Sequence, residues 1–400
     1  MNKFEPCLRF IAASDVHYQA EALKRKNNFE KGIALAYEYA ETQSYKGIDA
    51  VYVNGDFSNS GDLEQMQSFK ASLDASLKSG TQHMLTMASH EFMSEGEQKA
   101  IEKFKAVFGL EPDNHRVIAG FHFISVTTTN GCHFNDAKRE WIKAQLDIAA
   151  ADDPFKPIFF FQHPHITGTV YGSVLWGDDG ITDILMNYPQ IIDFSGHSHA
   201  PVNDPRNIHQ QHFTSVGTGS FKNFELDEFD KVYGTIPPEK DDAAQFLIVE
   251  ADTSGTVVIK PYDVITESFF GYNWIVENPW EPDGFVYTDA RFINPVKPFF
   301  AENSVLDCVV DGSDVNLHFT QAQIDVDRVN DYKITVRRKS DNAVVKQICI
   351  WSRYYLNDMP KTLNYRIEDM ARGEYTVSIA ARGFWNNHSI NKLIGEFCID

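Results

Sequence analysis

The stretch LRFIAASDVH, residues 8–17, places an Asp-x-His pair directly after a short, strand-like apolar run. Four later apolar runs end in a similar way, with Gly, Ser, Asp or His following within two residues. The five runs are Leu8–Ala13, Ala50–Asn54, Met84–Met87, Ile158–Phe161 and Ile191–Phe194. In α/β proteins the carboxyl ends of the strands form the face where ligands bind. We therefore expect the polar residues after these runs to meet on one face.

Seven Asp and His residues follow these runs, and their chemistry is that of metal ligands. They are Asp15, His17, Asp56, His90, His163, His197 and His199. Imidazole suits Mn, Fe and Zn, and a carboxylate can bridge two cations and neutralise part of their charge. A single catalytic metal uses about three or four protein ligands. The surplus predicts two metals roughly 3.5–4 Å apart, with some His left for proton transfer.

Helical patterns separate the strand-like runs. Apolar residues recur at spacings of three and four over Ala22–Ala40, Leu63–Lys78, Gly96–Phe108 and Ala137–Ala149. Strand and helix in repeated alternation predict an α/β domain. Two further runs, Phe246–Glu250 and Val257–Ile259, are separated by a turn-like cluster and predict additional strands. We assign residues 1–275 to this domain.

The chain changes character after residue 275. Prolines and aromatic residues occupy 276–300 without a helical or strand period, which predicts a linker. Beyond it, apolar and polar residues alternate at intervals typical of an antiparallel sandwich. The stretch GEYTVSIA, residues 373–380, is similar to the late strands of a fibronectin type III or immunoglobulin-like module. We assign 301–400 to an all-β sandwich, whose role is either stabilising or dimerising, or a cover over the active-site mouth.

The order of the polar motifs resembles that of a known family. Asp-x-His after the first strand is followed by Gly55-Asp56 with Gly61, then Ser89-His90-Glu91, then a single His after a strand, then Gly-His-x-His. This order is similar to that of the calcineurin-like metallophosphoesterase superfamily, over roughly residues 8–262. The resemblance implies a sandwich of two β-sheets flanked by helices, with the metals at the strand ends.

The resemblance also implies roles for individual residues. His90 would lie outside the metal shells as the catalytic histidine, protonating or hydrogen-bonding the departing oxygen, with Glu91 orienting it. The implied metal ligands are Asp15, His17 and His199 for the first metal, His163 and His197 for the second, and Asp56 as the bridge.

One position departs from the family pattern. Where that pattern has Gly-Asn before the catalytic histidine, this chain has Ala88-Ser89, so an amide ligand of the second metal is missing. We expect Ser89 to be a weak ligand, direct or through water, or the second site to be partly filled. His165, two residues after His163, is a further candidate for contact with the substrate phosphoryl group.

The resemblance implies a metal-dependent phosphoester hydrolase in which a metal-bound hydroxide attacks phosphorus. Our first interpretation is a phosphodiesterase acting on a nucleotide-type or other small phosphodiester, because residues 193–199, 203–206 and 213–216 look like bacterial members of the cyclic-nucleotide phosphodiesterase branch. A phosphomonoesterase or a nucleotide pyrophosphatase would use the same metals. A degenerate scaffold without catalysis is the alternative from another class, and the retained His90 and Asp56 argue against it. Mn is the expected metal, with Fe or Zn as alternatives.

Charge, cysteine content and the N-terminal sequence limit the classes of binding partner and the cellular compartment that we expect. A formal net charge of −20 argues against binding to nucleic-acid polymers or anionic membranes, so we expect a small phosphorylated substrate. Five irregularly spaced cysteines without a Cys-x-x-Cys pair predict reduced thiols. Residues 1–14 lack the pattern of a signal peptide, which predicts a cytoplasmic protein, with a trimmed leader as the alternative. An oligomer formed through the C-terminal domain stays open.

Overall fold

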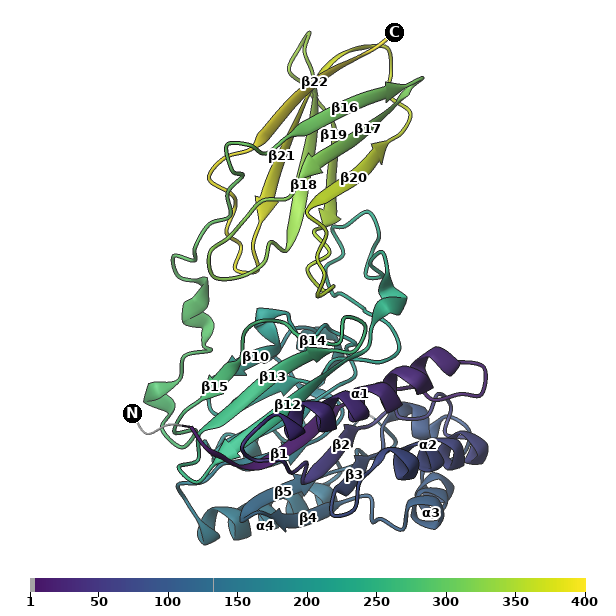
Figure 1. Cartoon of the computed structure of the whole chain (residues 1–400), viewed down its shortest axis with the longest axis vertical. Coiled ribbons are helices and arrows are strands. Elements are labelled where there is room, and N and C mark those ends of the chain that lie inside the picture. The colour runs from purple at the N-terminus through teal and green to yellow at the C-terminus, as the bar shows by residue number, and fades with distance from the viewer. Residues whose placement is uncertain (1–3, 132) are drawn as a thin grey trace. The chain divides into compact units, whose positions relative to one another are not determined.

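The computed structural model describes residues 4–131 and 133–400, so Cys132 lies outside the described residues. These residues form two compact units (Figure 1). The first unit comprises the chain up to Asp227 together with Lys240–Thr288, and the second comprises Glu228–Glu239 together with Asp289–Asp400. The boundaries at 275 and 300 expected from the sequence stay predictions.

The first sheet of the first unit has the strand order β14-β13-β12-β1-β2-β3, and β15 pairs with β13. The three strands β1, β2 and β3 are parallel, whereas β12 pairs antiparallel with β1. The bounds are β1 Pro6–Ala13, β2 Ala50–Asn54, β3 Gln82–Thr86, β12 Gln245–Asp252, β13 Val257–Asp263, β14 Ser268–Phe269 and β15 Trp274–Val276.

The second sheet has the order β10-β11-β9-β6-β5-β4. Its central strands β11, β9, β6 and β5 are parallel, and the two edge strands are antiparallel. The bounds are β4 Asn114–Ile118, β5 Phe121–Ser125, β6 Ile158–Phe161, β9 Ile191–Ser195, β10 Ile208–Gln210 and β11 Thr214–Gly217. A separate ladder of two short strands joins β7 (His165–Ile166) to β8 (Gly177–Asp178).

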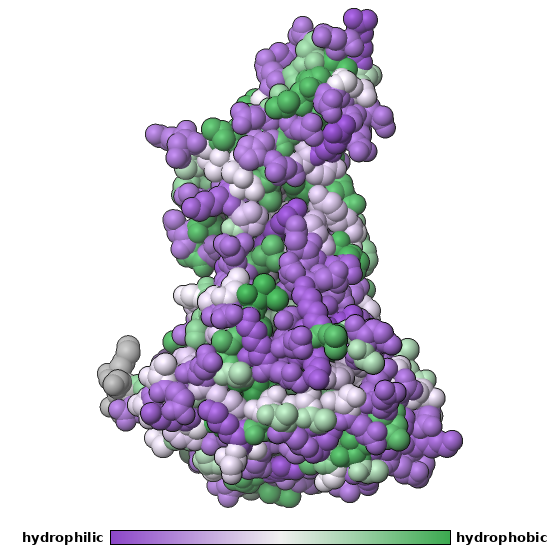
Figure 2. Space-filling view, turned by 45° about the vertical axis from the view of Figure 1, so that its right-hand side comes forward, coloured by the Kyte–Doolittle hydropathy of each residue, from purple (hydrophilic) through white to green (hydrophobic). Residues whose placement is uncertain are grey.

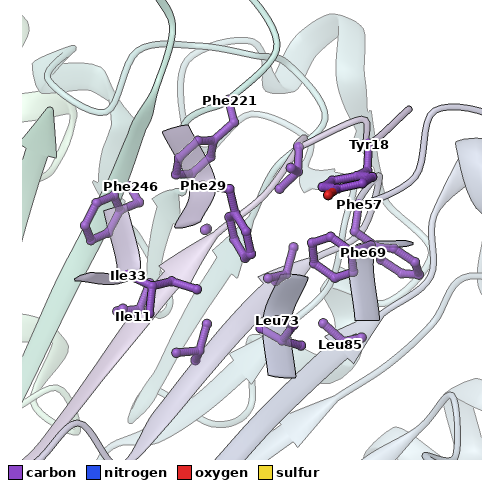
Figure 3. Packing of buried hydrophobic residues seen from close by; sticks show 14 of the residues in the cluster. Ile11, Tyr18, Phe29, Ile33, Phe57, Phe69, Leu73, Leu85, Phe221 and Phe246 are labelled. Atoms are coloured by element: carbon purple, nitrogen blue, oxygen red, sulfur yellow. The ribbon is translucent and has the colours of Figure 1, made fainter. Parts of the chain in front are cut away.

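The helices cover the outer faces of both sheets. The apolar faces of α1 (Leu23–Glu41), α2 (Leu63–Ser76) and α3 (Glu97–Phe108) pack on the first sheet, where Phe29, Phe69 and Phe246 belong to one buried cluster (Figure 3). On the second sheet lie α4 (Asp136–Asp152) and the short α6 (Thr182–Leu185). The four predicted helices are therefore confirmed, because their spacing of three and four matches a buried face.

A third apolar cluster fills the space between the two sheets. The Phe10 ring of β1 contacts Phe159 and Phe194 of the other sheet, at centroid distances of 4.9 and 5.7 Å. Tyr52 of β2 stacks on Phe161 of β6 at 3.6 Å. Side chains on both faces of β1, β2, β6 and β9 are buried, which explains why these strands are continuous apolar runs. The predicted α/β sandwich is confirmed.

The second unit is all β, as predicted. Two antiparallel sheets with the orders β16-β17-β20 and β19-β18-β21-β22 enclose a single apolar core. Buried and partly exposed residues alternate along β17 and β21, which is the pattern that the sequence shows there. The bounds are β16 Leu306–Asp311, β17 Asp314–Thr320, β18 Asp331–Arg338, β19 Val344–Trp351, β20 Thr362–Ile367, β21 Gly373–Arg382 and β22 Leu393–Ile399.

One segment of the second unit comes from the middle of the chain. Glu228–Glu239 leaves the first unit between β11 and β12 and packs on the sandwich through the fully buried Lys231. The Lys231 ammonium pairs with Glu228 and Asp331, each at 2.9 Å, and lies 4.2 Å from the centre of the Trp351 ring. Nothing in the sequence pattern indicated this excursion.

On the face of the molecule shown in Figure 2, hydrophilic residues predominate and hydrophobic residues are scattered. Among the described residues, no helix combines the length and the apolar character that crossing a membrane requires.

Candidate metal centre

The seven Asp and His residues selected from the sequence all follow the carboxyl ends of strands, and the structure brings them together. They are Asp15 and His17 after β1, Asp56 after β2, His90 after β3, His163 after β6, and His197 and His199 after β9. Their ligand atoms form three groups, and within each group these atoms lie within 4.8 Å of one another. The groups are Asp15–His17–His199, His17–Asp56–His90 and Asp56–His163–His197. Two of them coincide with the ligand sets implied for the two metals.

The backbone is strained at five of these residues. Their φ angles are 53° at Asp15, 47° at His17, 48° at Asp56, 75° at His197 and 53° at His199. Left-handed conformations in residues other than glycine cost of order 1–3 kcal/mol each and persist only where the surrounding structure imposes them. Asp and His adopt this region more readily than most residues. All five of these residues contribute ligand atoms to the groups.

The first group is centred on a carboxylate oxygen. Asp15 Oδ1 lies 3.2 Å from His199 Nε2 and 3.7 Å from His17 Nε2. The two imidazole nitrogens are themselves 3.2 Å apart. Asp15 Oδ1 is buried and has no hydrogen-bond partner among the described residues. A buried carboxylate oxygen that faces two imidazole nitrogens and lacks a hydrogen-bond donor is suited to binding a cation.

The second group is centred on Asp56. Its Oδ2 lies 3.3 Å from His163 Nε2, 3.9 Å from His17 Nε2 and 3.9 Å from His90 Nε2. His197 Nδ1 lies 3.1 Å from His163 Nε2. Asp56 Oδ2 therefore lies between ring nitrogens of the two groups, which is compatible with a bridging position.

Oxygen atoms outside the cluster hold two of the rings in place. The Nδ1 atoms of His163 and His90 lie 2.6 Å from the carbonyl oxygens of Asn54 and Asn59, so these nitrogens carry the proton and donate it. Their Nε2 atoms are left facing the cluster. A hydrogen-bond acceptor at Nδ1 fixes the tautomer of a metal-binding imidazole and raises the basicity of its Nε2.

Burial and neighbouring charges shift the pKa values of several groups in the cluster. Burial opposes ionisation of Asp15 and Asp56, but the neighbouring imidazoles hold both carboxyl pKa values below their usual range. Burial lowers the pKa of His17 to about 3 and that of His197 to about 4, so both are neutral and ready to act as ligands. Burial also disfavours protonation of His163, but Asp56 raises its pKa to about 9. One imidazolium thus faces two carboxylates.

These donors fit two transition-metal ions. Imidazole nitrogen and carboxylate oxygen are the ligand types of Zn, Mn and Fe sites, and both neutral imidazoles and ionised carboxylates are available. The orphaned Asp15 Oδ1 is the structural observation that agrees with this fit.

Glu91 occupies a different position from the one expected. Instead of orienting His90, its buried carboxylate accepts hydrogen bonds from the backbone N–H groups of Asp56, Ser58 and Ala88, at 2.9–3.0 Å. Burial and the charge of Asp56 raise the pKa of Glu91 to about 8. Glu91 therefore ties the loop after β2 to the turn after β3, and the carbonyl group of Asn59 orients His90.

Close packing of these loops explains the glycine of the second motif. Gly61 has φ +71°, and a Cβ there would lie 2.2 Å from the backbone oxygen of Glu91. Ser89 lies in the same turn, directly before His90, and is partly exposed. A Cβ on Gly131 would lie 2.5 Å from Cα of Ser89, so a third loop packs against this turn.

His165 is corrected from a substrate contact to a supporting residue. Both of its ring nitrogens are engaged, with Ser195 Oγ at 2.7 Å and Ser198 Oγ at 2.8 Å, and the side chain is buried. Burial lowers its pKa to about 3. It supports the loop that carries His197 and His199, and no ring nitrogen remains for a phosphoryl oxygen.

Three further residues lie beside the cluster. Trp176, at the end of α5 (Ser173–Trp176), meets the His197 ring edge to face at 5.0 Å and donates from its indole N–H to Asp227 at 3.2 Å. Arg25 and Lys222 lie near the first group. Sequence reasoning missed both cations, because neither follows a strand-like run or belongs to a motif.

Comparison with known proteins agrees with the geometry. Residues 8–201 match the family model described as calcineurin-like phosphoesterase, which confirms the predicted metallophosphoesterase domain. No curated protein matches the chain. The narrower likeness to the cyclic-nucleotide phosphodiesterase branch stays a prediction.

Two solved structures are similar to parts of the chain. A purple acid phosphatase from seeds of yellow lupin (Lupinus luteus) is 13% identical over 68% of this chain and 53% of that chain, with a TM-score of 0.49. The chain thus spans about half the length of that phosphatase. An immunoglobulin-like β-sandwich protein from Bacteroides vulgatus is 21% identical over 26% of this chain and 100% of that chain, with a TM-score of 0.17.

Proposed function

We propose that the calcineurin-like phosphoesterase domain, whose match to the family model covers residues 8–201, hydrolyses a small phosphoester with the help of two bound metal ions. The observation that carries this proposal is that Asp56 Oδ2 lies 3.3 Å from His163 Nε2 and 3.9 Å from His17 Nε2, between the two ligand groups, with His90 beside them. The ligands would be Asp15, His17 and His199 for one ion, His163 and His197 for the other, and Asp56 for both.

Bound metal ions would supply Lewis-acid activation of the phosphoryl group and a lowered pKa for the attacking water. The protein's own part is positioning and proton transfer. His90 Nδ1 donates to the carbonyl oxygen of Asn59, so Nε2 is the ring atom that faces the cluster. When protonated there, His90 donates a hydrogen bond or a proton to the departing oxygen. Trp176 forms an apolar wall beside His197.

Mn remains our proposed metal, with Fe and Zn as alternatives, because the ligand set suits all three. A phosphodiester remains the substrate expected from sequence likeness. A phosphomonoesterase or a nucleotide pyrophosphatase would use the same metal ligands. A scaffold without catalysis is the second candidate, favoured only by Ser89 in place of the family's asparagine.

Metal removal and ester hydrolysis together test the proposal. Protein loaded with Mn should hold about two ions per chain by elemental analysis and should cleave p-nitrophenyl esters of phosphate. Dialysis against a chelator should abolish cleavage, and added Mn should restore it. Stable metal binding without cleavage of any ester would favour the scaffold, and absence of metal binding would refute the proposal.

The Ser89→Asn substitution should strengthen the second metal site. An amide oxygen at this position restores the ligand that the family pattern has there, so we expect Mn stoichiometry at limiting metal to rise and kcat to rise with it. Isothermal titration calorimetry of metal-free protein with Mn measures the change in stoichiometry and affinity. Ser89→Ala is the matched control, and equal metal affinity in all three proteins would mean that residue 89 is not part of the site.

A further inference from the structure

Two positively charged side chains lie half-buried beside the Asp15–His17–His199 group. Arg25, in the first turn of α1, donates from Nη1 to the carbonyl oxygen of His17 at 3.2 Å. Lys222 lies on the loop between β11 and β12. In the portion of the chain that is described, neither cation forms an ion pair. The Asp241 carboxylate interacts electrostatically with Arg25, but its ion pair is formed with Lys240, at 3.1 Å.

The loop that carries Lys222 is fastened to the cluster on both sides of it. The N–H of Phe221 donates to the carbonyl oxygen of Asp15, and the N–H of Glu225 donates to that of His199, each at 3.2 Å. Lys222 interacts electrostatically with Arg25, Asp15, Asp56 and Glu225. Its ammonium group therefore lies at the edge of the centre and not on a distant surface.

An unpaired pair of like charges is an unfavourable arrangement in a folded protein. Burial lowers the pKa of both Arg25 and Lys222, because each cation loses water there. Lys260 shows the ordinary solution: it is similarly buried, but Glu250 at 2.8 Å raises its pKa. Among the described residues, no carboxylate comes within ion-pair distance of Arg25 or Lys222, so both cations are available to an anion from outside the chain.

The charge balance of the site with two metal ions bound indicates how much negative charge that anion carries. Asp15 and Asp56 offset only part of the charge of two divalent ions, and Arg25 with Lys222 adds further positive charge. A phosphodiester carries one negative charge and two non-bridging oxygens. A phosphomonoester at neutral pH carries nearly two charges on three such oxygens. The phosphomonoester therefore accepts more hydrogen bonds from the cations and neutralises more of their positive charge.

On the basis of the proposed function, we infer that Arg25 and Lys222 bind the phosphoryl oxygens of a doubly charged substrate and make the enzyme prefer phosphomonoesters over phosphodiesters. This substrate class differs from the diester expected from sequence likeness. Arg25 and Lys222 are then specificity residues, while the metal ligands and His90 serve either ester.

Two esters with the same leaving group test the inference: p-nitrophenyl phosphate and methyl p-nitrophenyl phosphate. In Arg25→Gln and Lys222→Gln, kcat/KM for the monoester should fall about 10-fold to 100-fold, the range expected for losing a hydrogen bond between charged groups. The same quantity for the diester should change little. A second readout is calorimetric binding of inorganic phosphate to Mn-loaded protein, whose Kd should rise by a similar factor.

Matched controls separate specificity from damage to the fold. Lys26→Gln removes a cation from the same helix, where Lys26 lies 3.8 Å from Glu30, and should leave both esters unaffected. Lys222→Arg keeps the charge and should keep phosphate binding. Equal losses on both esters, or lost metal, would overturn the inference and leave hydrolysis itself established. If the native protein cleaves neither ester, the proposed function fails, and the phosphate Kd alone decides on Arg25 and Lys222.

Discussion

Replacing Asp56 with Asn should cost the protein metal ions and nearly all hydrolysis. Asp56 Oδ2 lies within 3.9 Å of ring nitrogens from His17, His90 and His163, so its charge serves both ligand groups at once. Loss of residues that merely support a ligand typically costs about 10-fold to 100-fold, and loss of the shared ligand should exceed that. Elemental analysis and kcat for a p-nitrophenyl ester measure the two effects.

Asp193→Asn is the matched control for that substitution. Asp193 lies on β9, is equally buried, and accepts a hydrogen bond from Gln162 at 3.1 Å. Burial raises its pKa to about 8, so the carboxyl is largely uncharged at neutral pH and Asn resembles it closely. This variant should keep its metal. If Asp56→Asn also keeps both ions and full activity, Asp56 is not a bridging ligand.

Much of the fold and of the cluster could be predicted because both depend on short-range pattern. A strand such as Ile158–Phe161 is buried on both faces, so it is a continuous apolar run that can be recognised in the sequence. The polar residues that follow the run mark the ligand-binding edge of the sheet. The edge strands β4 and β10 were missed because they are short or partly exposed and lack such a run. Left-handed φ angles at Asp15 and Asp56 leave no trace in composition.

Long-range contacts set the limit of the sequence reading. Glu91 stands next to His90 in the chain, which favoured a direct role, but its carboxylate turns toward donors more than thirty positions earlier, at Asp56 and Ser58. The Glu228–Glu239 excursion depends on a pairing of Lys231 with Asp331, one hundred residues apart. Arg25 and Lys222 become neighbours only in the folded chain. No local pattern encodes such pairings.

His90→Gln should lower kcat for an alkyl phosphate by about 10²-fold to 10⁴-fold while leaving metal content unchanged, which is the usual range for a lost general acid. His90 Nε2 lies 3.9 Å from Asp56, farther than His163 at 3.3 Å, and its ring is partly exposed, as suits a group that meets substrate more than metal. Steady-state kinetics with elemental analysis of the same sample measures both quantities. The exposed His212 provides a control, since His212→Gln should change neither.

The leaving group decides whether His90 acts as a proton donor. An oxygen that departs readily without a proton, such as p-nitrophenolate, gains little from a general acid, whereas an alkoxide depends on it. The loss of kcat in His90→Gln should therefore be small for p-nitrophenyl phosphate and largest for an alkyl phosphate of similar size. An equal loss for both esters would mean that His90 stabilises the phosphoryl oxygens instead of protonating the leaving group. Lost metal would make His90 a ligand, because its Nε2 already lies with His17 and Asp56 in one potential ligand group.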